Sequence, residues 1–279
     1  MPAAFRIVID VVAYRLRRLE MANLVAAVAI MIALGTRPID LVIRTAFGAG
    51  LNVLAYLTND YCDVEQDLAE GRGPAKFLSE HLGAALGAQV GIALILASVA
   101  AWYDAGLLVP LVLGAGICWA SSARLKARPV VDILSMVLWG VAMPLVAFPL
   151  GNKLGWLLVI QLGPFSACFE PTQVLRDRDE DVRASVRTTA VAFGAERTRL
   201  LARLFMLVAM TYALLVLDRY VGLLLVVPVL VPIPREFSAV AISQYWNRIR
   251  LTQGLSWLGL LAGVYFRGTT HGWLLSGAP

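Results

Sequence analysis

The sequence predicts an all-α protein whose helices cross a membrane several times. Two observations carry this expectation. First, 59% of the 279 residues are hydrophobic, only 15% are charged, and the mean hydropathy is +0.74. A water-soluble domain of this length does not carry so much apolar surface. Second, apolar stretches of membrane-spanning length recur along the chain, separated by short polar loops.

Nine of these stretches predict transmembrane helices, which together would form one domain of residues 1–279. The eighth is short and ends near Pro232 and Pro234, and Pro144 should kink the fifth. The predicted helices are Leu19–Gly35, Ile39–Leu57, Leu82–Tyr103, Gly106–Ala123, Val130–Leu150, Leu154–Leu175, Leu200–Leu217, Tyr220–Ile233 and Leu251–Leu275.

Basic residues are concentrated on one side of these helices. Most of the 24 Lys and Arg residues fall in the N-terminal segment and in the loops after the even-numbered helices. Because cytoplasmic segments carry the excess of Lys and Arg, we expect a cytoplasmic N-terminus in a bacterial inner membrane. The basic amphipathic residues 1–18 are expected to lie on the inner leaflet. No cleavable signal peptide is expected.

Acidic side chains gather where the second predicted helix leaves the membrane. Asp60, Asp63 and Asp67 are spaced i, i+3 and i+7, so they should share one helix face. Asn59 lies four residues before Asp63 on the same side. Carboxylates this close repel one another unless a cation is present. Oxygen ligands with room left for water and phosphate suit Mg²⁺.

A second acidic cluster follows the sixth predicted helix, where Asp177 and Asp181 are four residues apart. Asn52 and Tyr56 lead up to the first cluster along the inward side of its helix. Polar residues inside a membrane segment are costly and tend to be functional. Either cluster alone could be ordinary solvated loop charge. Two of them, each followed by basic residues, favour a site that holds metal ions against a shared anion.

The first cluster resembles the leading motif of the UbiA superfamily of intramembrane prenyltransferases. Residues 59–67 match that motif, NDxxDxxxD, in full, and Arg72 and Lys76 match the basic residues that often follow it. The loop after the fourth helix usually reads YxxxK in this family. Here Lys126 matches the Lys, whereas Ser122 stands where Tyr is expected.

The second cluster resembles the family's other motif, DxxxD followed by GxK and a Thr or Ser. Asp177, Asp181 and Thr188 match it, with Ser185 in place of Gly and Arg187 in place of Lys. The resemblance covers roughly residues 19 to 194 in order and spacing. Two acidic motifs at the right separation are much more specific than either alone.

The resemblance implies nine helices around a central cavity open to the bilayer, and Mg²⁺-dependent ionisation of a polyprenyl diphosphate. Membrane lipid is an expected partner, and nucleic acid is not. The predicted metal ligands are Asn59, Asp60, Asp63, Asp67, Asp177 and Asp181. The predicted catalytic residues are Asp63, Asp67, Asp181 and Lys126. The predicted substrate-binding residues are Asn52, Tyr56, Asn59, Arg72, Lys76 and Arg187.

Three functions stay open at this point. The prenyl group could pass to an aromatic or lipophilic acceptor, or the same superfamily's terpene cyclase chemistry could close the chain on itself. Inward acids could also belong to a cation-coupled transporter. Aromatic side chains could stabilise an allylic cation, and the candidates are Tyr56, Trp119, Trp139, Phe165 and Phe169. Candidate proton acceptors are Glu20, Asp132 and Glu170.

Overall fold

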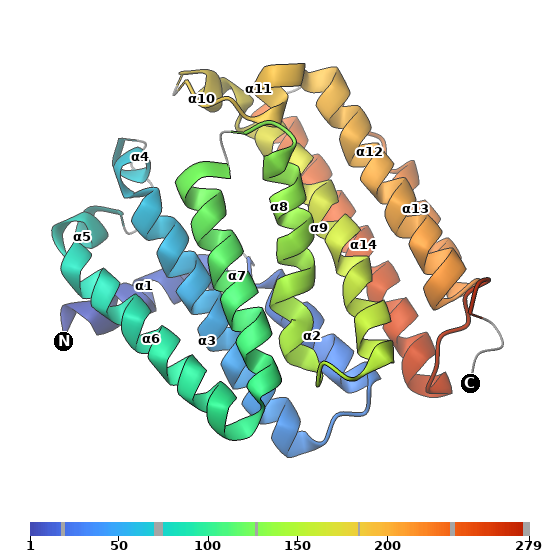
Figure 1. The fold of residues 1–279 in the computed structure, drawn as a ribbon. Helices are drawn as coiled ribbons and strands as arrows, with labels where there is room; N and C mark the ends of the chain where they lie inside the picture. The colour runs from blue at the N-terminus through green and yellow to red at the C-terminus, as the bar shows by residue number, and fades with distance from the viewer. Residues whose placement is uncertain (18–19, 70–74, 126–127, 184, 235–237, 276–279) are drawn as a thin grey trace. The chain divides into compact units, whose positions relative to one another are not determined.

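A computed structural model describes residues 1–17, 20–69, 75–125, 128–183, 185–234 and 238–275 of the chain. Every regular element in these ranges is helical, and their β contact is a single isolated bridge between Asp218 and His271 (Figure 1). The predicted all-α class is therefore confirmed. The chain divides into two compact units, each built from several separate segments.

The first unit comprises Met1–Val28, Arg37–Arg124 and Ala142–Gly151. Its main helices are α1 (Ala3–Arg17), α3 (Pro38–Cys62), α4 (Val64–Ala69), α5 (Ala75–Glu80), α6 (Leu82–Tyr103), η1 (Ala105–Leu107), α7 (Leu108–Ala120) and η3 (Met143–Ala147). Helix α3 is the centre of this unit, because α1, α6, α7 and η3 all pack against it.

The second unit comprises Ala29–Thr36, Leu125–Val141 and Asn152–Pro279. Its main helices are α9 (Lys153–Arg176), α10 (Arg178–Arg183), α11 (Thr189–Phe193), α12 (Ala195–Tyr212), η4 (Ala213–Leu217), η5 (Val221–Leu225), α13 (Val226–Leu230) and α14 (Ala239–Arg267). Helix α9 packs on α12 and α14. The chain passes between the units within α2 (Ala22–Ala33), η2 (Ser121–Leu125) and α8 (Val131–Ala142).

Local sequence signals set several helix limits. Helix α3 begins at Pro38, where the missing backbone N–H breaks no helical hydrogen bond. Asn152 caps α9, since its side-chain oxygen accepts the Gly155 N–H at 2.9 Å. Helix α14 ends at Gly268, whose φ of +70° closes the helix in the left-handed region that suits glycine.

Two glycines allow helices to approach closely within their units. In the first unit, a Cβ on Gly114 of α7 would lie 2.7 Å from Met143 Sδ. In the second, a Cβ on Gly140 of α8 would lie 2.3 Å from Ser166 Oγ and 2.5 Å from the Leu162 carbonyl oxygen of α9. No side chain fits at either position without a shift of its neighbours.

Each of the nine predicted ranges contains helix among the described residues, and α6 has the predicted limits. Three helical stretches are long and apolar enough to cross a membrane: Pro38–Cys62, Leu82–Tyr103 and Ala195–Leu217. The expected kink at Pro144 takes another form. Helix α8 stops at Ala142 and the chain tightens into the 3₁₀ turn η3, whose geometry tolerates a proline near its start.

Large apolar side chains face outward from both units. Trp102 on α6 is 80% exposed and Phe266 on α14 is 82% exposed. In water such a surface would drive aggregation, whereas in a bilayer it contacts lipid tails. Together with the three helices that are long and apolar enough to cross a membrane, this surface is that of a membrane protein.

Candidate active site

The first acidic motif runs from the end of α3 into α4. Asp63 ends α3, and its N–H bonds to the Asn59 carbonyl oxygen at 2.9 Å. The Asp67 N–H bonds to the Asp63 carbonyl oxygen at 2.9 Å, so the chain resumes a helical course after one non-helical residue. The motif is therefore a helix with a break at Asp63, and the continuous helix expected from the sequence is interrupted there.

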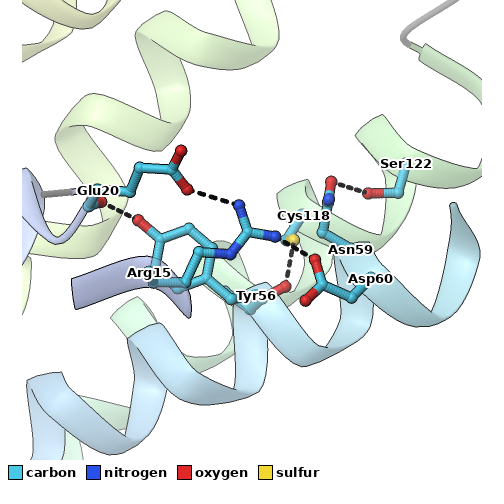
Figure 2. Close-up of polar contacts among 8 residues, drawn as sticks. Arg15, Glu20, Tyr56, Asn59, Asp60, Cys118 and Ser122 are labelled. Atoms are coloured by element: carbon cyan, nitrogen blue, oxygen red, sulfur yellow. Dashed lines mark hydrogen bonds and ion pairs between the residues drawn. The ribbon is translucent and has the colours of Figure 1, made fainter. Parts of the chain in front are cut away.

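The first two residues of the motif point to different neighbours, as Figure 2 shows. Asn59 Oδ1 accepts a hydrogen bond from Ser122 Oγ at 3.1 Å. Asp60 instead forms a buried ion pair with Arg15 of α1, and its side chain is only 6% exposed. Adjacent helical residues project about 100° apart, so neighbouring side chains meet different elements. The side chains of Asn59 and Asp60 thus point in different directions and contact different elements.

The polar stripe that leads to the motif is buried in the first unit. Asn52 is 2% exposed, and its Nδ2 donates to the Gly48 carbonyl oxygen at 2.8 Å. Its Oδ1 is buried without a hydrogen-bond partner among the described residues. A buried acceptor without a donor costs stability, which points to a ligand or water that would supply one. Tyr56 donates its hydroxyl hydrogen to the Glu20 carbonyl oxygen.

The predicted basic partners of this motif are only partly described. Lys76 lies on α5 with an exposed side chain. Arg72 and Lys126 lie outside the described residues. Their predicted contacts with a diphosphate stay predictions.

The second acidic motif lies at the end of α9 and in α10. Asp177 is the C-cap of α9. Arg176 donates two hydrogen bonds to its carboxylate, from Nε to Oδ1 at 2.7 Å and from Nη2 to Oδ2 at 2.9 Å. Asp181 is 6% exposed, and its Oδ2 accepts a hydrogen bond from Thr188 Oγ1 at 3.0 Å. Thr188, which the resemblance singled out, thus fixes the orientation of the second carboxylate. Arg187 beside it is exposed.

The loop after the second motif adopts a left-handed conformation at Ser185, with a φ of +58°. This is the position where the family motif has glycine, which takes such a φ at no steric cost. The structure therefore gives a backbone reason for that glycine, and Ser185 holds the same conformation under strain.

A buried contact that the sequence did not predict holds this loop. Asp132 is 1% exposed, and its carboxylate accepts hydrogen bonds from the Thr189 N–H at 3.0 Å and Thr189 Oγ1 at 2.6 Å. It also accepts the Ile133 N–H, and Thr189 Oγ1 in turn accepts the Val130 N–H at 2.8 Å. Because both carboxylate oxygens already accept hydrogen bonds, Asp132 is a structural anchor and a poor candidate for the proton acceptor.

The aromatic candidates divide by exposure. Trp119 is 59% exposed, so its ring faces away from the interior of its unit. Phe165 is buried and meets Trp257 edge to face, with ring centroids 6.1 Å apart. Phe169 packs on Trp246 at 5.1 Å. Phe165 and Phe169 are therefore better placed than Trp119 to line an enclosed space, and the sequence analysis missed the partner Trp257.

The donor atoms of the two motifs fit magnesium. Carboxylate and amide oxygens are the ligands this ion prefers, and it commonly takes one or two carboxylates while water and substrate phosphate complete its shell. Within the described part of the chain, no three His, Cys, Asp or Glu side chains converge on a metal position by themselves. The motifs belong to different units, so their sharing of one diphosphate stays a prediction.

Comparisons with known proteins agree with the motifs. The profile of the UbiA prenyltransferase family matches residues 22–273. No curated protein matches the chain in sequence. The chain resembles the structure of a UbiA homolog from Archaeoglobus fulgidus bound to DMAPP and Mg²⁺, with a TM-score of 0.67 and 16% identity over 90% of this chain and 97% of that one.

The same archaeal homolog has also been solved bound to GPP and Mg²⁺. That structure matches with a TM-score of 0.61 and 14% identity over 95% of this chain and 100% of the other. A structure bound to Cd²⁺ matches with a TM-score of 0.60 and 16% identity over 88% and 96%. At these identities the likeness shows a common fold.

Proposed function

The chain belongs to the UbiA prenyltransferase family, and we therefore propose that it ionises a polyprenyl diphosphate in a membrane cavity with the help of Mg²⁺. The prenyl group would then pass to an aromatic or lipophilic acceptor. The observation that carries this proposal is the pair of oxygen-rich helix ends on α3 and α9, each followed by basic residues. The homolog with this fold binds DMAPP or GPP together with Mg²⁺.

In this proposal five residues hold metal: Asn59, Asp63, Asp67, Asp177 and Asp181. Bound Mg²⁺ would neutralise the diphosphate and stabilise it as a leaving group. Asp63, Asp67 and Asp181 act as catalytic residues, since they would hold charge against the leaving group as the bond to carbon breaks. Asp60, the sixth predicted ligand, differs from Asp177 in that its ion pair with Arg15 is more deeply buried than that of Asp177 with Arg176, and it is treated separately below.

Basic side chains would bind the diphosphate directly. Lys76 and Arg187 are exposed on the segments that follow the two motifs, where each can donate to phosphate oxygens. Arg72 and the catalytic Lys126 complete the proposed set. Asn52, with its unpartnered oxygen, and Tyr56 would line the substrate end of the cavity.

The apolar surroundings would protect the reaction. Loss of diphosphate leaves an allylic cation that water would quench, so the prenyl chain needs a dry enclosure. An aromatic ring can stabilise such a cation by about 0.5–2 kcal/mol, and Phe165 and Phe169 are the best-placed candidates. The proposal also includes nine transmembrane helices that form a single domain of residues 1–279. It places the N-terminus in the cytoplasm and the protein in a bacterial inner membrane.

The experiment that tests the function uses purified protein in lipid nanodiscs. It is incubated with Mg²⁺ and prenyl diphosphates of increasing length, with and without an aromatic acceptor. Diphosphate release and organic products are measured. We expect release that disappears with a chelator, and prenylated product only when the acceptor is present.

Other outcomes would redirect the proposal. A cyclic hydrocarbon formed without acceptor would identify a terpene cyclase instead of a transferase. No magnesium-dependent diphosphate release from any donor would contradict the proposal. Uptake of a labelled solute by proteoliposomes, with no prenyl chemistry, would then favour a cation-coupled transporter.

A further inference from the structure

Helix α1 packs against the helices that carry the first acidic motif. Ile7 and Val11 are 2% and 1% exposed, and they join a hydrophobic cluster with Leu57 of α3 and Val64 of α4. The neighbouring surface of α1 is apolar but exposed, with Phe5 58% exposed. One side of α1 is thus fixed to the motif-bearing helices, while another is suited to lipid.

At the end of α1, Arg15 reaches into the first unit and makes several contacts at once. One of its terminal nitrogens pairs with Asp60, and the other donates to Glu20 Oε2 at 2.7 Å (Figure 2). Its guanidinium lies 4.8 Å from the centre of the Tyr56 ring. The side chain of Arg15 is only 14% exposed. Burial alone would lower the pKa of Arg15, but the Asp60 and Glu20 carboxylates outweigh this effect. The pKa is therefore raised, and the group stays charged.

The direction of Asp60 sets it apart from the rest of its motif. Asn59 meets Ser122 after α7, whereas Asp60 meets α1. Its second oxygen, Oδ2, and the Nε of Arg15 are both buried without a hydrogen-bond partner among the described residues. A buried ion pair with unsatisfied atoms is costly for stability alone, which suggests that the pair is present for another reason.

We propose that Arg15 and Asp60 are positioning residues that clamp α1 onto α3. The clamp thereby holds the end of α3, where the first motif begins, in the orientation that metal binding requires. Asp60 then serves as the counter-ion of this clamp and not as a ligand of the metal. The role of the motif itself rests on the proposed function, whereas the clamp rests on the contacts of Arg15. Sequence alone grouped Asp60 with the ligands because it shares their residue type and spacing.

The physics of buried ion pairs gives a sharp test. Removing one partner leaves the other charge buried without compensation, whereas replacing both by apolar residues of similar size is often neutral. Arg15→Met and Asp60→Leu should therefore each loosen α1, and the double variant should dock it again. Neither change removes an atom of the Tyr56 hydroxyl bond to the Glu20 backbone. Arg17→Gln, on an exposed residue of the same helix, is the matched control.

Two quantities are measured on full-length protein in nanodiscs. Amide hydrogen exchange over residues 3–17 reports the docking of α1, and Mn²⁺ binding in the presence of inorganic diphosphate, followed by electron paramagnetic resonance, reports the metal site. Each single variant should raise α1 exchange by at least about tenfold. The double variant should return α1 exchange and Mn²⁺ affinity to within about threefold of wild type, a range typical of neutral surface changes.

The result that overturns the clamp is unchanged α1 exchange in both single variants. A double variant that restores α1 exchange but loses Mn²⁺ affinity by about tenfold or more would return Asp60 to the metal ligands. Failure of the proposed function looks different. In that case wild-type protein would show neither diphosphate-dependent Mn²⁺ binding nor product, while the exchange results would stand.

Discussion

At the scale of single residues, Ser185 shows how one backbone angle can explain a sequence preference. Its φ of +58° lies where side chains with a Cβ are strained by roughly 1–2 kcal/mol. Ser185→Gly should therefore stabilise the protein by about 1 kcal/mol, and Ser185→Val should destabilise it. Thermal unfolding in detergent measures both. Ser98→Gly, on an exposed interior position of α6, should have the opposite sign, and stabilisation by both glycines would contradict the explanation.

The proposed catalytic carboxylates give a second prediction at this scale. Asp63→Ala and Asp181→Ala should each lower the turnover of a prenyl diphosphate by at least about 100-fold, because each removes charge that stabilises the leaving group. Circular dichroism and melting temperature should change little for Asp63. Asp179→Ala, whose side chain is 87% exposed in α10, is the control and should keep its activity. Wild-type turnover in either test variant would remove that residue from the site.

At the scale of elements, the crossing of α8 and α9 depends on Gly140. A methyl group there would meet Ser166 Oγ at 2.3 Å and the Leu162 carbonyl oxygen at 2.5 Å, and the carbonyl belongs to rigid helix backbone. Gly140→Ala should destabilise the protein by about 1–3 kcal/mol through overpacking. The denaturant midpoint in detergent measures this loss. Gly116→Ala, which has open space around its Cβ, should be neutral or slightly stabilising.

A second element-scale prediction concerns the anchor that joins the start of α8 to α11. Thr189→Val keeps the shape of the side chain but removes the hydroxyl shared by Val130 and Asp132. Loss of these bonds leaves buried polar groups unpaired and should cost about 1–3 kcal/mol. Hydrogen exchange over residues 128–134 should rise. Thr252→Val, whose partly exposed hydroxyl donates within α14 to the Arg248 and Ile249 carbonyl oxygens, should leave both the stability and the exchange of this segment unchanged.

The same elements show what the sequence could and could not predict. Helix α6 was predicted to the residue because its apolar run is uninterrupted between His81 and Asp104. Helix α12 begins at Ala195, ahead of the predicted Leu200, because its polar first turn after Gly194 is invisible to hydropathy. The short helix α5, which lies in a polar loop, was missed for the same reason.

For the site, the spacing of the acidic residues predicted which residues belong to it, but not which residues they contact. The motif residues could be found because they repeat at helical intervals. The pairing of Asp60 with Arg15 joins positions 45 residues apart, and the bond of Asp132 to Thr189 joins positions 57 apart. No local pattern encodes such contacts, since they depend on how helices pack. An Asp in the first turn of a predicted helix was the one available hint of the Asp132 anchor.

At the scale of the whole molecule, the three cysteines provide a test of orientation in the membrane. Cys62 is exposed at the end of α3, inside the first motif, whereas Cys118 and Cys168 are buried. If the excess of basic residues places both acidic motifs in the cytoplasm, a membrane-impermeant maleimide should label Cys62 in inside-out vesicles and not in intact cells.

A second cysteine, introduced on the opposite side of the membrane, tests the same orientation from outside. Gly151 is exposed and has open space for a side chain, and it lies in the loop predicted on the outer side. In a Cys62→Ser background, Gly151→Cys should label in intact cells. Labelling of the buried Cys118 and Cys168 gives the background signal in intact cells and in inside-out vesicles. Labelling of Cys62 from outside would reverse the orientation and remove the cytoplasmic source of Mg²⁺ and diphosphate substrate on which the proposed reaction depends.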